Sequence, residues 1–171
     1  MFSTKCPGSM TIAAALALFS SVAAGQHANS SELEIMKSLE GRWEGSTTPG
    51  DPEAVVTYAV TSGGTAVVET LFPGTSREMM TVYHDDVHGQ LVMTHYCNAG
   101  NQPFLSLVES SGDELHFELS PDDRTIDVEN EWHAHGLTLT IGGDGTLAHE
   151  WRYWNEGERR GGRDIQLVRV E

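Results

Sequence analysis

The stretch of residues 31–43, Ser-Glu-Leu-Glu-Ile-Met-Lys-Ser-Leu-Glu-Gly-Arg-Trp, changes from a helical to an extended pattern. Ser31 and Glu34 have the spacing of a capping box, and apolar residues recur at helical intervals over 33–39. Gly41 stands where such a helix ends. The stretch therefore predicts one short helix followed by the first strand of a β domain.

After Gly41 the sequence alternates short runs rich in Val, Thr, Tyr, Phe and Trp with turn signals spaced about ten residues apart. The turns carry residues that accept a positive φ, such as Ser62-Gly63-Gly64 and Gly142-Gly143-Asp144-Gly145. The pattern predicts strands over 42–48, 54–61, 65–72, 78–84, 90–97, 104–110, 114–119, 126–133, 137–141, 146–155 and 163–170.

The short turns make neighbouring strands antiparallel. About ten such strands in sequence would expose two sheet edges unless the sheet closes. Closure gives an up-and-down barrel, and a two-sheet sandwich is the alternative. We therefore expect an all-β fold, an antiparallel up-and-down β-barrel of about ten strands with a short N-terminal helix.

Gly41-Arg42-Trp43, directly after the predicted helix, resembles the Gly-x-Trp signature of lipocalins and their calycin relatives. The resemblance implies that Trp43 fills the closed end of the barrel. It also implies that Arg169, in the last strand, covers the indole ring in a cation–π contact.

Most of the chain after the N-terminal segment also resembles a family of secreted bacterial calycin-like proteins of unknown function. The similar segments are 64–74, 80–84, 94–103, Trp132-His133-Ala134-His135 and Glu150-Trp151-Arg152-Tyr153. The chain departs from the family pattern at Asn98, Phe104-Leu105 and Gly136. The resemblance implies a barrel with a ligand-sized cavity and implies no reaction.

The N-terminal segment, residues 1–25, has the features of a secretory signal peptide. Lys5 precedes an apolar stretch at 10–19, and small residues at 21–25 offer a cleavage site. The apolar stretch is shorter than the ~20 residues of a membrane-spanning helix. We expect a single calycin-like domain over 26–171 that is periplasmic or secreted.

The composition is acidic, with a formal net charge of −15 at pH 7. Such a charge repels phosphate backbones and anionic lipid, which argues against nucleic acid or a membrane surface as a partner. Cys97 is the only cysteine after the signal segment, so the predicted domain has no internal disulfide and depends on its hydrophobic core.

Chemically versatile residues gather in the run 95–103, His-Tyr-Cys-Asn-Ala-Gly-Asn-Gln-Pro, at the end of a predicted strand. His95 and Cys97 are two residues apart, as are His133 and His135, so each pair shares one face of its strand. If both faces point inward, four donors of the kind that bind zinc, copper or haem iron converge.

Three further residues belong to the candidate site. Asn101 and Gln102 are predicted in a turn at the barrel rim, with the Gln102 amide available to a ligand. Glu69 interrupts an apolar run; alternation favours its solvent face. If it is buried, it needs a partner and marks the site.

These residues support three hypotheses. The first is a barrel that binds a small apolar or aromatic molecule, with His95, Cys97, Asn101, Gln102, His133, His135 and Glu69 around it. The second is a metal or haem protein, with zinc or haem held by His95, Cys97, His133 and His135. The third is an enzyme that uses Cys97 as its nucleophile. Oligomeric state stays open.

Overall fold

A computed structural model of the protein describes Met1 and residues 28–47 and 53–170. Apart from Met1, the predicted signal segment 1–25 lies outside the described residues. None of the helices in the described residues is long and apolar enough to cross a membrane.

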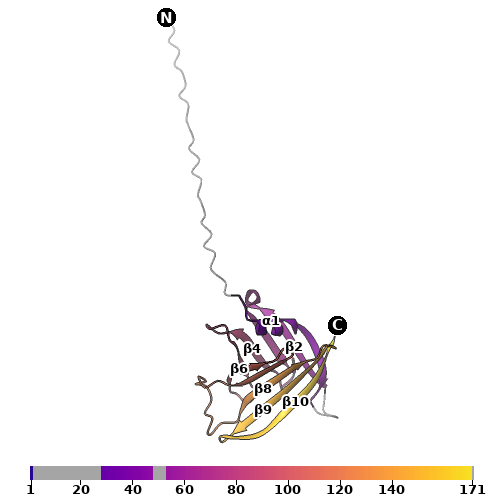
Figure 1. Ribbon diagram of the computed structural model, residues 1–171, viewed down its shortest axis with the longest axis vertical. Helices are drawn as coiled ribbons and strands as arrows, with labels where there is room; N and C mark the ends of the chain where they lie inside the picture. Colours follow the sequence, from indigo (N-terminus) through magenta and orange to yellow (C-terminus); the bar gives the residue numbers. More distant parts are fainter. Residues whose placement is uncertain (2–27, 48–52, 171) are drawn as a thin grey trace.

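The described chain forms a closed antiparallel barrel of ten strands with one short α-helix, as the sequence predicts (Figure 1). Each strand pairs with its neighbours in sequence, and β1 also pairs with β10, which closes the barrel. The elements are α1 (Ser31–Ser38), β1 (Gly41–Ser46), β2 (Glu53–Thr61), η1 (Ser62–Gly64), β3 (Ala66–Leu71), β4 (Met79–Asp85), β5 (Leu91–Tyr96), β6 (Phe104–Ser110), β7 (Glu114–Leu119), β8 (His133–Ile141), β9 (Thr146–Asn155) and β10 (Glu158–Val170).

The cap of helix α1 differs from the capping box expected at Ser31. Ser30 is the N-cap residue, and its hydroxyl oxygen accepts from the backbone N–H of Leu33 at 2.9 Å. The same hydroxyl donates to Asp85 of β4 at 2.6 Å. The N-cap residue is therefore one that also contacts the barrel, at Asp85. The residue spacing within the helix segment carries no information on such a contact.

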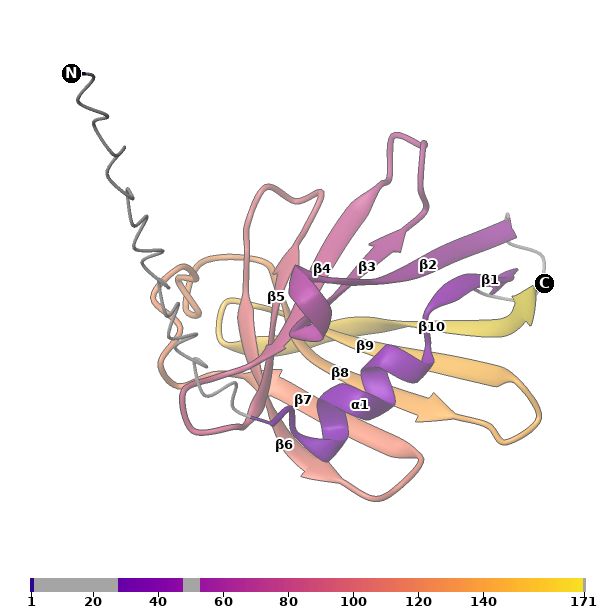
Figure 2. The same ribbon diagram turned by 90° about the horizontal axis from the view of Figure 1, so that it is seen from above.

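Helix α1 lies across one end of the barrel (Figure 2). Trp43 fills this end and is 1% exposed, with its indole N–H donating to the Leu39 carbonyl at 2.8 Å. The guanidinium of Arg169 lies 4.4 Å from the centre of the Trp43 ring. It also donates to the carbonyl oxygens of Ser38 and Glu40. The predicted contact between Arg169 and Trp43 is confirmed.

The strand predicted over 126–133 is wrong. Most of this segment belongs to a loop, and β8 begins only at His133. The Asp127 carboxylate accepts from the backbone of Glu129 and the side-chain amide of Asn130, and the Asp127 carbonyl accepts from the backbone of Glu131. These local bonds replace the hydrogen bonds of a strand.

The last strand is longer than predicted. Residues 158–162 precede the strand predicted over 163–170 but belong to β10, and the turn is confined to Glu156 and Gly157. A register shift between Arg159 and Gly161 lets the strand continue past this glycine-rich segment.

Candidate functional site

A cavity of about 140 Å³ lies at the end of the barrel away from α1, and we call it the mouth cavity. Cavities of ~150 Å³ accommodate a benzene ring, so this one suits a single-ring molecule. A haem macrocycle exceeds that volume. The lining residues are Phe72, Arg77, Met79, His95, Cys97, Asn98, Trp132, Tyr153 and Arg163.

His95 lines the cavity from inside the barrel and is 2% exposed. Its ring packs on the indole of Trp151 with centroids 4.6 Å apart, and its Nδ1 lies 3.0 Å from the Thr81 hydroxyl. Burial lowers the pKa of His95 to about 4, so the imidazole is neutral at pH 7.

Glu69 is fully buried, so the expectation that it faces solvent is wrong. On β3 it shares the inward parity of Val67 and Leu71, both of which are buried in the core. The hydroxyls of Tyr58 and Tyr83 donate to its two carboxylate oxygens at 3.1 and 2.9 Å. Burial raises the pKa of Glu69 to about 7, while hydrogen bonds from Thr81 and the two tyrosines oppose that rise.

The ionisation of Glu69 is linked to the hydrogen position on His95. When Glu69 is ionised its carboxylate can only accept, and the Thr81 hydroxyl that lowers its pKa donates to it. The Thr81 oxygen then accepts from Nδ1 of His95, 3.0 Å away. In this tautomer Nε2 keeps its lone pair, and it has no hydrogen-bond partner among the described residues. The cavity floor then presents a neutral nitrogen acceptor.

Sequence reasoning missed His149, the remaining member of the network. It is fully buried on β9, its Nε2 lies 2.9 Å from the Tyr58 hydroxyl, and burial lowers its pKa to about 3. In the described part of the chain its Nδ1 has no hydrogen-bond partner, but it lies 3.5 Å from a Glu69 oxygen. The available signal was its alternation with Leu147 and Trp151, both of which face the core.

Cys97 lies just past the end of β5, at the cavity wall, and is half-buried. Its sulfur is 4.0 Å from that of Met79 and 3.9 Å from the Asn98 side-chain oxygen. Burial raises the pKa of the Cys97 thiol. A nucleophilic cysteine needs the opposite shift, so the geometry does not favour the enzyme hypothesis.

His133 and His135 lie on the outer face of β8, away from the mouth cavity, although His133 is fully buried. In the ladder His133 pairs with Trp154, on the face opposite the buried Trp151, and a bulge follows at His135. His133 Nε2 is 3.0 Å from His135 Nδ1, and the His135 ring stacks on Trp154 with centroids 4.0 Å apart. Nearby Glu131 contributes the carbonyl that His133 Nδ1 contacts at 2.8 Å.

The four-donor cluster predicted for zinc or haem is therefore not brought together. The inward-facing histidine and the cysteine lie at the cavity, whereas the second histidine pair lies on the outer face. Among the described residues, no group of three or more His, Cys, Asp and Glu side chains is arranged to hold a metal ion.

Asn101 holds the loop that carries Trp132 into the cavity wall. Its side-chain amide donates to the Trp132 carbonyl at 2.7 Å and to the Glu131 carboxylate at 2.9 Å, and the residue is 6% exposed. Trp132 then stacks on Tyr153 with centroids 4.7 Å apart. Asn101 thus positions the wall and does not line it.

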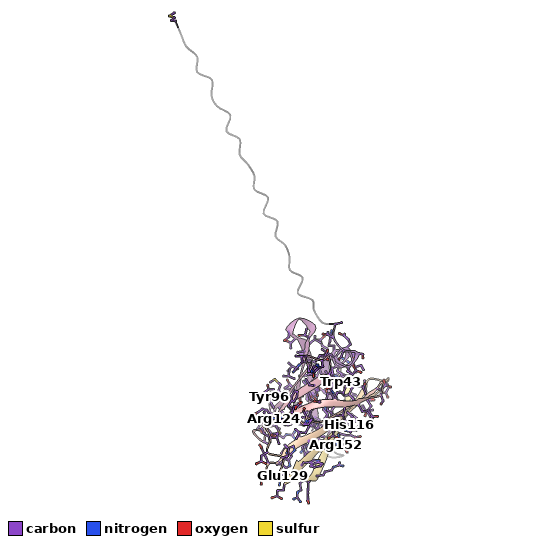
Figure 3. The ribbon with its side chains drawn as sticks, turned by 60° about the vertical axis from the view of Figure 1, so that its left-hand side comes forward. Trp43, Tyr96, His116, Arg124, Glu129 and Arg152 are labelled. Atoms are coloured by element: carbon purple, nitrogen blue, oxygen red, sulfur yellow. The ribbon has the colours of Figure 1, made fainter. Side chains whose placement is uncertain are left out.

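Gln102 faces a different hollow, of about 460 Å³, on the outside of the barrel, which Tyr96 and Arg124 also line. In Figure 3 these last two residues are labelled close together, to the left of Trp43. The Gln102 side chain donates to the Gly100 carbonyl at 3.2 Å. It is not part of the mouth cavity.

Two guanidinium groups line the mouth cavity without a carboxylate partner in the described part of the chain, those of Arg77 and Arg163. Arg77 lies 4.4 Å from the centre of the Phe72 ring. Arg163 comes two residues before the inward-facing Ile165 and pairs with Trp151 in the ladder, so this exposed residue is on the inner face at the rim. The cavity is therefore a cationic spot on an acidic protein.

Another hollow lies elsewhere, with a volume of about 690 Å³. It is on the outside of the α1 end, lined by Ala28, Asn29, Thr65 and the β4–β5 turn from Asp85 to Gly89. It shares no lining residue with the mouth cavity, and its charged groups are acidic.

No protein-family model matches the sequence, and a search of curated proteins finds no match. Among solved structures, the chain is similar to Rv2717c from M. tuberculosis. The TM-score is 0.57 at 15% sequence identity, and the match covers 84% of this chain and 100% of the other. At this identity the likeness concerns the fold alone.

Proposed function

We propose that this protein is a periplasmic or secreted calycin-like barrel that binds a small aromatic molecule carrying one anionic group. The mouth cavity carries this proposal, because it combines the volume of one aromatic ring with aromatic walls and two guanidinium groups without carboxylate partners. The acidic surface supports a small molecule over nucleic acid or anionic membranes as the partner.

The walls suit a planar ring. Trp132 and Tyr153 form a stacked pair on one side, and Phe72 lies at the rim under Arg77. Burial raises the pKa of Tyr153 to about 12, so its hydroxyl stays protonated and can donate to a ligand. Flat aromatic ligands stack on such side chains.

The proposed anionic group on the ligand is inferred from the two arginines that line the cavity. A guanidinium donates two parallel hydrogen bonds to a carboxylate, and Arg163 meets no competing carboxylate among the described residues. A hydrogen bond to a charged group contributes about 1.5–3 kcal/mol. This contribution corresponds to a preference of roughly tenfold to a hundredfold for a carboxylate over its neutral amide.

The test compares benzoate and phenylacetate with benzamide by isothermal titration and by the change in tryptophan fluorescence. We expect the carboxylates to bind at least ~10-fold more tightly than benzamide. Arg163→Gln should reduce this preference, because it removes one of the two guanidinium groups that line the cavity. Arg159→Gln is the matched control, since Arg159 is on the same strand, has no carboxylate partner among the described residues and does not line the cavity.

Equal affinity for benzoate and benzamide would contradict the anionic part of the proposal. Absence of binding for the whole series, with the barrel folded, would contradict the proposal as a whole.

A further inference from the structure

We propose that the mouth cavity also holds one Cu(I) ion, with the Cys97 thiolate and the Met79 thioether as its main ligands and His95 Nε2 as the third. This goes beyond the proposed function, because it uses the β4–β5 wall of the cavity and not the aromatic and arginine wall. The sulfur pair did not emerge from the sequence pattern, since Met79 lies 18 residues before Cys97.

The backbone register brings the two sulfur atoms together. Met80 pairs with Tyr96 in the antiparallel ladder between β4 and β5, so Met79 lies opposite Cys97 where the ladder ends. The two sulfur atoms are 4.0 Å apart. Two sulfur ligands that each lie ~2.3 Å from one metal ion, at a trigonal angle, are also about 4.0 Å apart.

His95 supplies an independent observation. It is 2% exposed and lines the same cavity, and its Nε2 has no partner among the described residues. Because Nδ1 contacts the Thr81 hydroxyl, Nε2 is the ring nitrogen that remains free to bind the metal ion. Metal-binding histidines characteristically have their other ring nitrogen held in this way.

The ligand set favours Cu(I) over Zn(II). Thiolate and thioether sulfur are soft ligands, which select Cu(I), and a thioether adds little to a zinc site. Charge favours the same ion, because Cu(I) bound to one thiolate adds no net charge beside Arg77 and Arg163. Zn(II) bound to one thiolate would add a positive charge there.

The binding step balances simply. Cu(I) binds the Cys97 sulfur as the thiolate, the thiol proton leaves to solvent, and no electron is transferred.

The experiment titrates the reduced protein with Cu(I) under anaerobic conditions, in competition with bicinchoninate, and with Ag(I) as a redox-inert probe. We expect one equivalent to bind, and X-ray absorption at the copper edge to show two sulfur neighbours near ~2.3 Å. Cys97→Ser and Met79→Leu should each weaken binding at least ~10-fold. His133→Gln is the control, because this histidine lies on the outer face of β8, and it should leave binding unchanged.

Met79→Leu conserves volume and should keep the fold, which circular dichroism can check. The proposal is overturned if either sulfur variant binds Cu(I) as the wild type does, if only nitrogen and oxygen neighbours are found, or if Zn(II) binds more tightly than Ag(I). Titrations of the wild-type protein with benzoate alone and with Cu(I) alone separate the two proposals, since either one can fail while the other succeeds.

Discussion

Glu69 is the residue whose chemistry most depends on its place inside the barrel. Its carboxylate is fully buried and receives two tyrosine hydroxyls, yet burial still raises its pKa to about 7. At neutral pH the group is therefore divided between its two protonation states. The unpartnered Nδ1 of His149, 3.5 Å away, is placed to accept a hydrogen from the protonated form.

The pKa of Glu69 has a consequence for stability. Because the folded protein holds this proton more strongly than the unfolded chain does, the contribution of Glu69 is present below about pH 4.5 and is lost as pH rises toward 7. His95 and His149 act in the opposite sense, since burial lowers their pKa values to about 4 and about 3. Their contribution is present above the unfolded pKa of 6.5 and is lost on acidification.

Glu69→Gln should remove the first of these effects and leave the second. Between pH 5 and 7 the free energy of unfolding of the variant, relative to wild type, should rise by roughly 1 kcal/mol per pH unit. Urea denaturation at several pH values measures this difference. Glu118→Gln, on the outer face, is the control. Its free energy of unfolding should change with pH as that of wild type does. A constant offset between Glu69→Gln and wild type would contradict the raised pKa.

The sequence predicted the place of some of the candidate site residues and not of others. His95 and Cys97 were expected at the cavity and both line it. The orientation of Glu69 was misjudged because the run around it is apolar on both parities, so the alternation that favoured the solvent face was a poor guide here. His133 and His135 were misplaced because a bulge and the loop before β8, neither visible in the pattern, put them on the outer face of β8.

Among the elements, the loop before β8 differs most from expectation. Ile126 and Val128 alternate with polar residues as in a strand, but Asp127 and Asn130 bond to the local backbone and to each other. Apart from β8 and β10, which begin four and five residues before their predicted starts, the strands lie within a few residues of their predicted bounds, since hairpin turns between β-branched runs are strong local signals. A loop held by side chains from another segment, such as Asn101, has no such signal.

Asn101→Ala should loosen this loop. The variant loses hydrogen bonds to Trp132 and Glu131, which should cost about 1–3 kcal/mol of stability. Hydrogen exchange should increase over 125–132, and the stacking of Trp132 on Tyr153 should weaken. Gln102→Ala changes the next residue and should stay within about 0.5 kcal/mol of wild type. If both variants behave alike, the loop does not depend on Asn101.

Across the whole molecule, the two ends of the barrel differ in packing. The α1 end is filled by apolar side chains around Trp43, whereas the far end keeps a cavity with polar groups. Closure requires β1 and β10, the first and last strands, to pair. Arg169 acts at this junction, because its guanidinium covers Trp43 and donates to two carbonyls at the end of α1.

Arg169→Lys tests whether geometry or charge secures the closed end. Lysine keeps the positive charge but cannot reach both carbonyls with a planar fork, so we expect a loss of about 1–2 kcal/mol in the free energy of unfolding. Benzoate and copper binding at the opposite end should be unchanged in the folded variant. Arg159→Lys, at an exposed position of the same strand, should have no measurable effect. If Arg169→Lys also leaves the free energy of unfolding unchanged, a positive charge at this position is sufficient. Closure then depends on the β1–β10 ladder and the buried Trp43.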